Sequence, residues 1–265
     1  MDTRPAPWNA TAYQRVAAPQ TSWGREVLDR LQLKGDETVL DAGCGPGKLT
    51  RLLIERLPRG RVVALDASPE MLSVAKKELA GFGSRVELVQ AALPLLPLSS
   101  PVDAIFSTAT LHWVSDQPAA YRAFFGAIRP GGQLEFQCGG PENLHLLHVR
   151  ATELAGAAEY ADAFVGWKES WWYPGAEETA ESLRAAGWTR VHTWLERRPT
   201  PFADAASFSD FIASVNLRPF LAQLDPARAR RFTATLVEAA GHDEPPYVLD
   251  YHRLNGSARA PEVEE

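Results

Sequence analysis

Short apolar runs alternate with amphipathic stretches through the first 140 residues, and this rhythm predicts the secondary structure. The runs expected to form strands are 39–40, 61–66, 85–89, 102–107 and 133–138. Leucine and aromatic side chains recur at helical spacing around these runs and predict helices at 23–34, at 48–57, from 68 onward and at 116–128. Strands that alternate with helices imply a parallel sheet with right-handed crossovers. We therefore predict an α/β fold with helices on both faces of a mostly parallel sheet.

Beyond Gly140 the pattern is looser and predicts more helix than strand. Helices are expected at 144–160, 177–186 and 203–240, and strands at 188–195 and 247–254, which brings the sheet to seven strands. Because the last two strands are far apart in sequence, we predict that 202–240 form a helical cap over the substrate side. The expected divisions are an N-terminal helical segment (1–34), a core (35–140), the rest of the sheet with the cap in the same domain (141–258) and a disordered tail (259–265).

Composition narrows the classes of partner. The chain has 265 residues, of which 45% are hydrophobic and 23% charged, as in an ordinary globular protein. A net charge of -6 without a run of Lys or Arg disfavours a nucleic-acid partner. No apolar stretch approaches the roughly 20 residues that span a bilayer, and the N-terminus lacks the apolar core of a signal peptide. The two cysteines, Cys44 and Cys138, exclude a disulfide framework, so we expect a cytoplasmic location. We also expect a monomer or weak homodimer with no membrane partner.

A glycine-rich turn follows the first strand. Asp41 ends that strand, and Gly43, Gly45 and Gly47 follow before the next helix. Glycine lets a backbone turn tightly and approach a ligand closely. The G-x-G-x-G spacing differs from the G-x-G-x-x-G of dinucleotide-binding loops, which disfavours a nicotinamide-dependent oxidoreductase. A carboxylate at the strand end suits a ligand with a cationic amino group better than a pyrophosphate.

The second strand also ends in an acid, Asp66. It lies about 20 residues after the glycine-rich turn, where α/β nucleotide folds place a carboxylate that binds the ribose hydroxyls. Ser68 then provides an N-cap, with Pro69 at the first helical position. Taken alone, Asp66 could cap a turn and Met71 could be a core residue. Together the segment resembles motif I and the D-x-S-x-x-M pattern of class I S-adenosylmethionine (SAM)-dependent methyltransferases.

The resemblance implies a Rossmann-like methyltransferase fold, SAM as the cofactor and no metal. The cofactor contacts that it implies are Asp41, Gly43, Gly45, Gly47, Asp66, Ala67, Met71, Ala92, Leu93 and Thr108. One departure is Ala92, where family members usually carry an acid that accepts a hydrogen bond from the adenine amino group. A missing hydrogen bond costs about 0.5–1.5 kcal/mol, so weaker SAM binding is expected. A SAM-binding protein without activity is the alternative that this departure leaves open.

The segment 109–117 (ATLHWVSDQ) follows the fourth strand, where open α/β sheets present their ligand crevice. With an N-terminal W-x-x-x-x-Y at Trp8 and Tyr13, it resembles small-molecule methyltransferases of the trans-aconitate methyltransferase type. The RPGGQLEFQ segment resembles the L-x-P-G-G that precedes the fifth strand in class I methyltransferases. Insect juvenile hormone acid methyltransferases are a related match, and malonyl-carrier-protein methyltransferases a looser one. The resemblance covers residues 8–150 well and the remainder weakly. It implies O-methylation of a small carboxylic acid.

Methyl transfer is an in-line displacement, so the main task of the enzyme is to hold the nucleophile and the methyl group about 3–3.5 Å apart. A carboxylate is ionised at pH 7 and needs no base, whereas a phenol, amine or carbon acid usually does. His112 is a candidate base, a hydrogen-bonding residue of the binding wall, or a histidine that only begins a helix. Tyr13 could lie over the sulfonium or only hold the N-terminal segment in place. The candidate acceptor-binding residues are Trp8, Tyr13, His112, Trp113 and Arg253.

Further side chains in the second half bear on the acceptor. Aromatic residues are dense between 167 and 220; most are expected in the core and two or three at the ligand, which favours a monocarboxylic acid with an apolar body. A polycarboxylate would need several cations, and the candidates are Lys168, Arg198, Arg218 and Arg253. A protein or nucleic-acid methyltransferase is disfavoured, because the chain has no Asn-Pro-Pro-Tyr-type or basic signature.

Overall fold

A computed structural model describes residues 18–169 and 171–262 of the chain. Contacts divide these residues into two compact units. The sheet unit comprises 18–141, 171–196 and 253–262, and the helical unit comprises 142–169 and 197–252. Trp8 and Tyr13 lie outside the described residues. Whether the helical unit shares a domain with the sheet and caps its substrate side stays a prediction.

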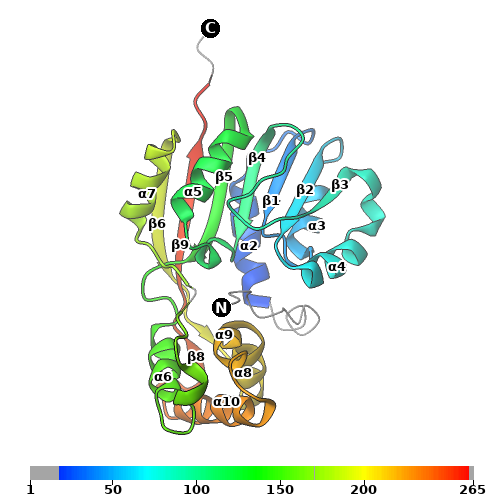
Figure 1. Ribbon diagram of the computed structural model, residues 1–265. Coiled ribbons are helices and arrows are strands. Elements are labelled where there is room, and N and C mark those ends of the chain that lie inside the picture. Colours follow the sequence, from blue (N-terminus) through cyan, green and yellow to red (C-terminus); the bar gives the residue numbers. More distant parts are fainter. Residues whose placement is uncertain (1–17, 170, 263–265) are drawn as a thin grey trace. The chain divides into compact units, whose positions relative to one another are not determined.

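The sheet unit is built on seven strands in the order β3-β2-β1-β4-β5-β9-β6 (Figure 1). Their bounds are β1 Thr38–Ala42, β2 Arg61–Asp66, β3 Val86–Gln90, β4 Val102–Thr108, β5 Ile128–Gly139, β6 Thr189–Arg197 and β9 His252–Arg259. β1 pairs in parallel with β2 and β4, β2 with β3, and β4 with β5, whereas β9 runs antiparallel to β5. The predicted α/β fold with a mostly parallel sheet is confirmed.

Helices cover both faces of this sheet because successive strand residues point to opposite sides. The helices are α2 Ala18–Arg30, α3 Lys48–Glu55, α4 Pro69–Glu78, α5 Gln117–Ala127 and α7 Ala176–Ala185, with short 3₁₀ turns η1 Ala80–Arg85 and η2 Leu111–Trp113. Val39 packs in one core with residues of α2 and α3. Leu40, the next residue, packs in the other core with residues of α5 and α7. The predicted helix start at Ser68 is confirmed, because its side chain accepts a hydrogen bond from the Met71 N–H. The helix expected at 23–34 instead runs from Ala18 to Arg30.

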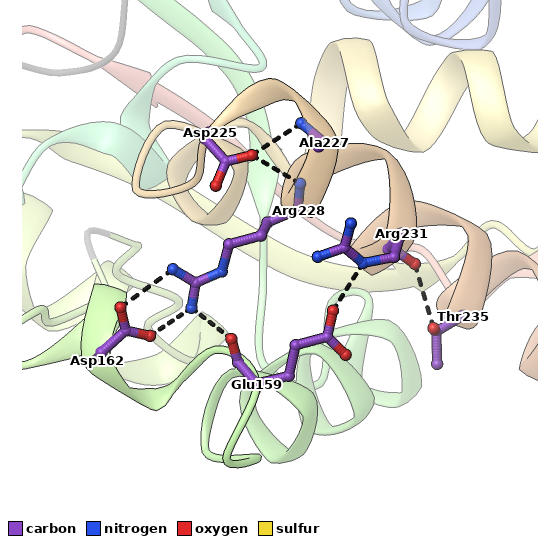
Figure 2. Close-up of polar contacts among 7 residues, drawn as sticks. All are labelled: Glu159, Asp162, Asp225, Ala227, Arg228, Arg231 and Thr235. Atoms are coloured by element: carbon purple, nitrogen blue, oxygen red, sulfur yellow. Dashed lines mark hydrogen bonds and ion pairs between the residues drawn. The ribbon is translucent and has the colours of Figure 1, made fainter.

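The helical unit holds most of the second half of the chain. Its elements are α6 His145–Ala155, η3 Ala161–Phe164, β7 Thr200–Pro201, α8 Ala205–Phe211, the π-helical turn η4 Ile212–Asn216, α9 Arg218–Leu221, α10 Pro226–Gly241 and β8 Val248–Leu249. Near the start of α10, the Arg228 guanidinium contacts the Asp162 carboxylate and the carbonyl oxygen of Glu159, and Arg231 Nε donates to the Glu159 carboxylate at 2.7 Å (Figure 2). These contacts join η3 and the turn before it to α10.

Several expected boundaries were wrong. The expected helix 203–240 is three α-helices and a π-helical turn, and α6 ends at Ala155. The expected last strand is two pieces, because backbone groups of Asp250 and Tyr251 bond outside the sheet, to Leu144 and Arg198. The expected disorder after 258 is also wrong up to Pro261: Ala260 N–H donates to Gly132 at 2.9 Å. No helix among the described residues is long and apolar enough to cross a membrane.

Candidate cofactor and acceptor site

The glycine-rich turn links β1 to α3 through backbone that only glycine adopts easily. Gly43, Gly45 and Gly47 have φ angles of 87°, 53° and 87°. A Cβ on Gly43 would clash with the Thr110 side chain, whereas one on Gly45 would point into open space. Gly43 is therefore required by packing, and Gly45 leaves one side of the loop open to a ligand.

Asp66 ends β2 beside this loop. One of its carboxylate oxygens accepts the Gly45 N–H and the other accepts the Ser68 N–H, each at 2.8 Å. Burial raises the pKa of Asp66, and these backbone hydrogen bonds oppose the rise. Asp66 thus ties the glycine loop to the start of α4, at the strand end where a ribose is expected.

Asp41, at the end of β1, is only 1% exposed. The Thr50 hydroxyl of α3 donates to its carboxylate at 2.6 Å. Burial raises the pKa of Asp41 to about 7, and the nearby Asp66 charge adds to that rise. A cationic group at this carboxylate would favour the ionised form. Thr50 was missed in the sequence, where one hydroxyl in a helix's first turn carries no signal.

Two further candidate segments meet Asp66. Ala91 N–H donates to the Asp66 carbonyl at 3.2 Å, so Ala92 lies just beyond the carboxyl end of β3, next to that of β2. Ala92 is exposed and Leu93 half-buried. On the α4 side, Ala67 is exposed and Met71 is buried.

His112 lies in η2, after the carboxyl end of β4, where Thr108 is the last strand residue. The Gly139 N–H donates to His112 Nδ1 at 3.3 Å. An amide N–H can only donate, so Nδ1 is the acceptor and Nε2 carries the proton of the neutral ring. The imidazole is buried and stacks on Tyr173, with ring centroids 5.9 Å apart and an interplanar angle of 25°. Trp113 packs beside it at 5.3 Å.

Comparisons with known proteins point the same way. A family described as a methyltransferase domain matches residues 39–132. Trans-aconitate 2-methyltransferase of Methylobacterium radiotolerans is 34% identical over 249 residues, covering 91% of this chain and 92% of that protein. The enzyme of the same name from an Azoarcus species is 32% identical over 82% of this chain and 83% of its own. A phosphoethanolamine N-methyltransferase of Haemonchus contortus, solved in complex with S-adenosyl-L-methionine, has a TM-score of 0.61 at 17% identity, over 96% of this chain and 57% of its own.

The chain belongs to the class I SAM-dependent methyltransferases. It is an enzyme whose cofactor is SAM, and the residues fit that group: a glycine loop with an open side, and a buried and a half-buried carboxylate at adjacent strand ends. The alternative of a nicotinamide-dependent oxidoreductase is wrong. The individual cofactor contacts stay predictions.

In this methyltransferase, the irregular segment 171–174 lies against the His112 turn. Trp172 N–H donates to the His112 carbonyl at 3.0 Å, and the Trp171 ring lies 5.8 Å from that of Trp113. The Gln117 side chain donates to the Trp172 carbonyl at 3.2 Å. Gln117 was not among the predicted site residues. A polar side chain at the first position of an amphipathic helix is ordinarily solvated, so the sequence did not single it out.

Arg253 is 3% exposed and lies opposite Gly139 in the β5–β9 pair. Its Nε donates to Gln137 Oε1 at 3.4 Å, and its guanidinium carbon lies 5.1 Å from the centre of the Trp23 ring. Because Gly139 also holds His112, the structure brings Arg253 and His112 to the same end of β5.

The other three cations proposed for the acceptor, Lys168, Arg198 and Arg218, belong to the helical unit.

Four of the aromatic residues between 167 and 220 are buried, and one of them, Trp188, lies in the sheet unit. Phe208, Phe211 and Phe220 are buried, and Trp167 packs on Phe220 at 4.7 Å, all within the helical unit. Trp171, Trp172 and Tyr173 instead belong to the segment 171–174 of the sheet unit.

Proposed function

We propose that this methyltransferase methylates a carboxylate oxygen of a small organic acid. Its relatives are named for methylating one such acid, trans-aconitate. A carboxylate oxygen attacks the methyl carbon of SAM, the carbon–sulfur bond breaks, and sulfur keeps the electron pair as a neutral thioether. No proton moves, because the carboxylate is already ionised near pH 7.

The observation that carries this proposal is which ring nitrogen of His112 accepts a hydrogen bond and which carries the proton. Its Nδ1 accepts the Gly139 N–H, and its Nε2 carries a proton. Taking up a further proton at Nδ1 would break the Gly139 hydrogen bond, so the ring is poorly suited to be a base. It is well suited to donate a hydrogen bond from Nε2 to an acceptor carboxylate.

The second feature in favour of an acid is the buried cation Arg253 at the same end of β5. A guanidinium matches a carboxylate with two parallel N–H donors. In this proposal Arg253 attracts the acid, His112 orients it, and the aromatic side chains of Trp113 and Tyr173 contact its carbon skeleton.

The test is incubation with SAM and a panel that contains trans-aconitate, simpler mono- and dicarboxylic acids, phenols and amines, read by mass spectrometry for the addition of one methyl group. Mild alkali then separates the product classes, because methyl esters hydrolyse whereas aryl ethers and N-methyl amines do not. A product formed from an acid and lost in alkali is expected. An alkali-stable product from a phenol, amine or carbon nucleophile would overturn the proposal and return His112 to the role of base.

A further inference from the structure

Gln117 is the first residue of α5, yet it is only 1% exposed. Its amide nitrogen donates to the Leu111 carbonyl at 2.9 Å and to the Trp172 carbonyl at 3.2 Å. Its amide oxygen accepts the Tyr121 hydroxyl at 3.1 Å. A primary amide has two donors on one nitrogen and an acceptor oxygen, and all three functions are used here.

These bonds join the start of α5 to the neighbouring turn η2 and to a segment 55 residues away in sequence. Leu111 belongs to η2, Tyr121 to α5, and Trp172 to the segment 171–174 that leads into α7. The segment itself forms neither helix nor strand, so its backbone groups depend on bonds such as these. The Trp172 side chain is 47% exposed, so packing of its indole does little to hold the segment.

The segment in turn forms one wall around His112. Trp172 N–H donates to the His112 carbonyl, Tyr173 stacks on the imidazole, and Trp171 packs against Trp113. A partly open pocket of about 230 Å³ is bordered by Gln117, Trp172 and residues of α7. A segment released from Gln117 therefore has space into which it can shift.

We propose that Gln117 is a positioning residue that sets acceptor selectivity: it fastens segment 171–174 against the His112 turn and so shapes the aromatic wall that the acid meets. Gln117 bonds to Leu111, Trp172 and Tyr121, none of which belongs to the glycine loop or its neighbouring strand ends. Its loss should affect the acceptor and leave SAM binding unchanged. The kinetic part of this proposal rests on the proposed function, whereas the fastening itself does not.

The decisive variant is Gln117→Met, which keeps the length of the side chain and removes all three hydrogen bonds. The matched control is Tyr121→Phe, which removes only the hydroxyl bond and keeps both bonds to the carbonyls. Amide hydrogen exchange of the peptide containing Trp172 is compared with SAM affinity by calorimetry and with KM and kcat for the methylated acid. Each lost hydrogen bond is worth up to about tenfold in an equilibrium constant.

In Gln117→Met we expect exchange at Trp172 and acceptor KM each to rise about tenfold or more, with the SAM dissociation constant within about twofold of wild type. Tyr121→Phe should stay close to wild type in exchange at Trp172, in acceptor KM and in the SAM dissociation constant. Unchanged exchange in a folded Gln117→Met protein would overturn the proposal, as would a parallel loss of SAM affinity. Failure of both Gln117→Met and Gln117→Glu to fold would assign Gln117 a structural role instead. Faster exchange without methylation of any acid would sustain the fastening and reject only the proposed function.

Discussion

At the carboxyl ends of the strands, the candidate site residues near β1 and β2 are positioned differently from those near β4 and β5. On the β1–β2 side, the backbone determines the geometry of the site, through glycines with positive φ and N–H groups that donate to Asp66. On the β4–β5 side, single side chains join distant segments, as where Gly139 holds His112 or Gln117 holds Trp172. A backbone-built site suits a cofactor that never changes. A side-chain-built site can change its ligand by a few substitutions, which is the expected place for acceptor specificity.

The largest effect is expected from Asp66→Ala, which tests the cofactor side. The variant removes the carboxylate that holds the Gly45 and Ser68 N–H groups and that is proposed to bind ribose. Hydrogen bonds to a charged group are worth about 1.5–3 kcal/mol each, so calorimetry should show SAM affinity reduced about 100-fold or more. Glu70→Ala, which removes an exposed acid of the same helix start, is the control. Wild-type affinity in a folded Asp66→Ala protein would remove the ribose assignment.

Asp41→Asn should weaken SAM binding while making the free protein more stable. Burial raises the pKa of Asp41 from 3.8 to about 7, so the folded state binds this proton more tightly than the unfolded state. The free energy of unfolding contributed by this group therefore falls as pH rises from about 4 to about 7, and is constant above that. Asn carries no charge and avoids this loss.

Urea denaturation at pH 5 and pH 8 measures the effect. The gain in unfolding free energy from Asp41→Asn should be larger at pH 8 than at pH 5 by about 1–3 kcal/mol. Asn keeps an acceptor for the Thr50 hydroxyl, so the hydrogen bond is not the variable. Equal gains at the two pH values would show that the Asp41 carboxyl does not titrate in this range.

Ala92→Asp is expected to have a smaller effect in the opposite direction. The new carboxylate, just past the end of β3, would accept the adenine amino group and tighten SAM binding by about 0.5–1.5 kcal/mol. Ala92→Asn, with an acceptor but no charge, is the comparison. Unchanged affinity in calorimetry with both variants would place the adenine elsewhere or show that another group already binds it.

The contrast between the two sides also explains what could be predicted from the sequence. Asp41 and the glycines lie within a stretch of seven residues, so their spacing could be recognised as a motif from the sequence. The bonds that define the acceptor side join residues with sequence separations of 27 and 55, which no local pattern indicates. The tail was misjudged for a related reason: Ala260 and Pro261 pair with Gly132 and Gly131 through backbone alone, and their side chains carry no strand signal.

The central claim is that no protein base is needed at His112, and the pH dependence of kcat in wild type and His112→Gln tests it most directly. Glutamine can accept the Gly139 N–H and donate a hydrogen bond, yet it is not basic. We predict that the rate is flat above the pKa of the acceptor acid in both proteins and that His112→Gln retains most of kcat, whereas His112→Ala chiefly raises KM. A wild-type rate that rises through pH ~6.5 and collapses in His112→Gln would contradict the account and establish general-base catalysis.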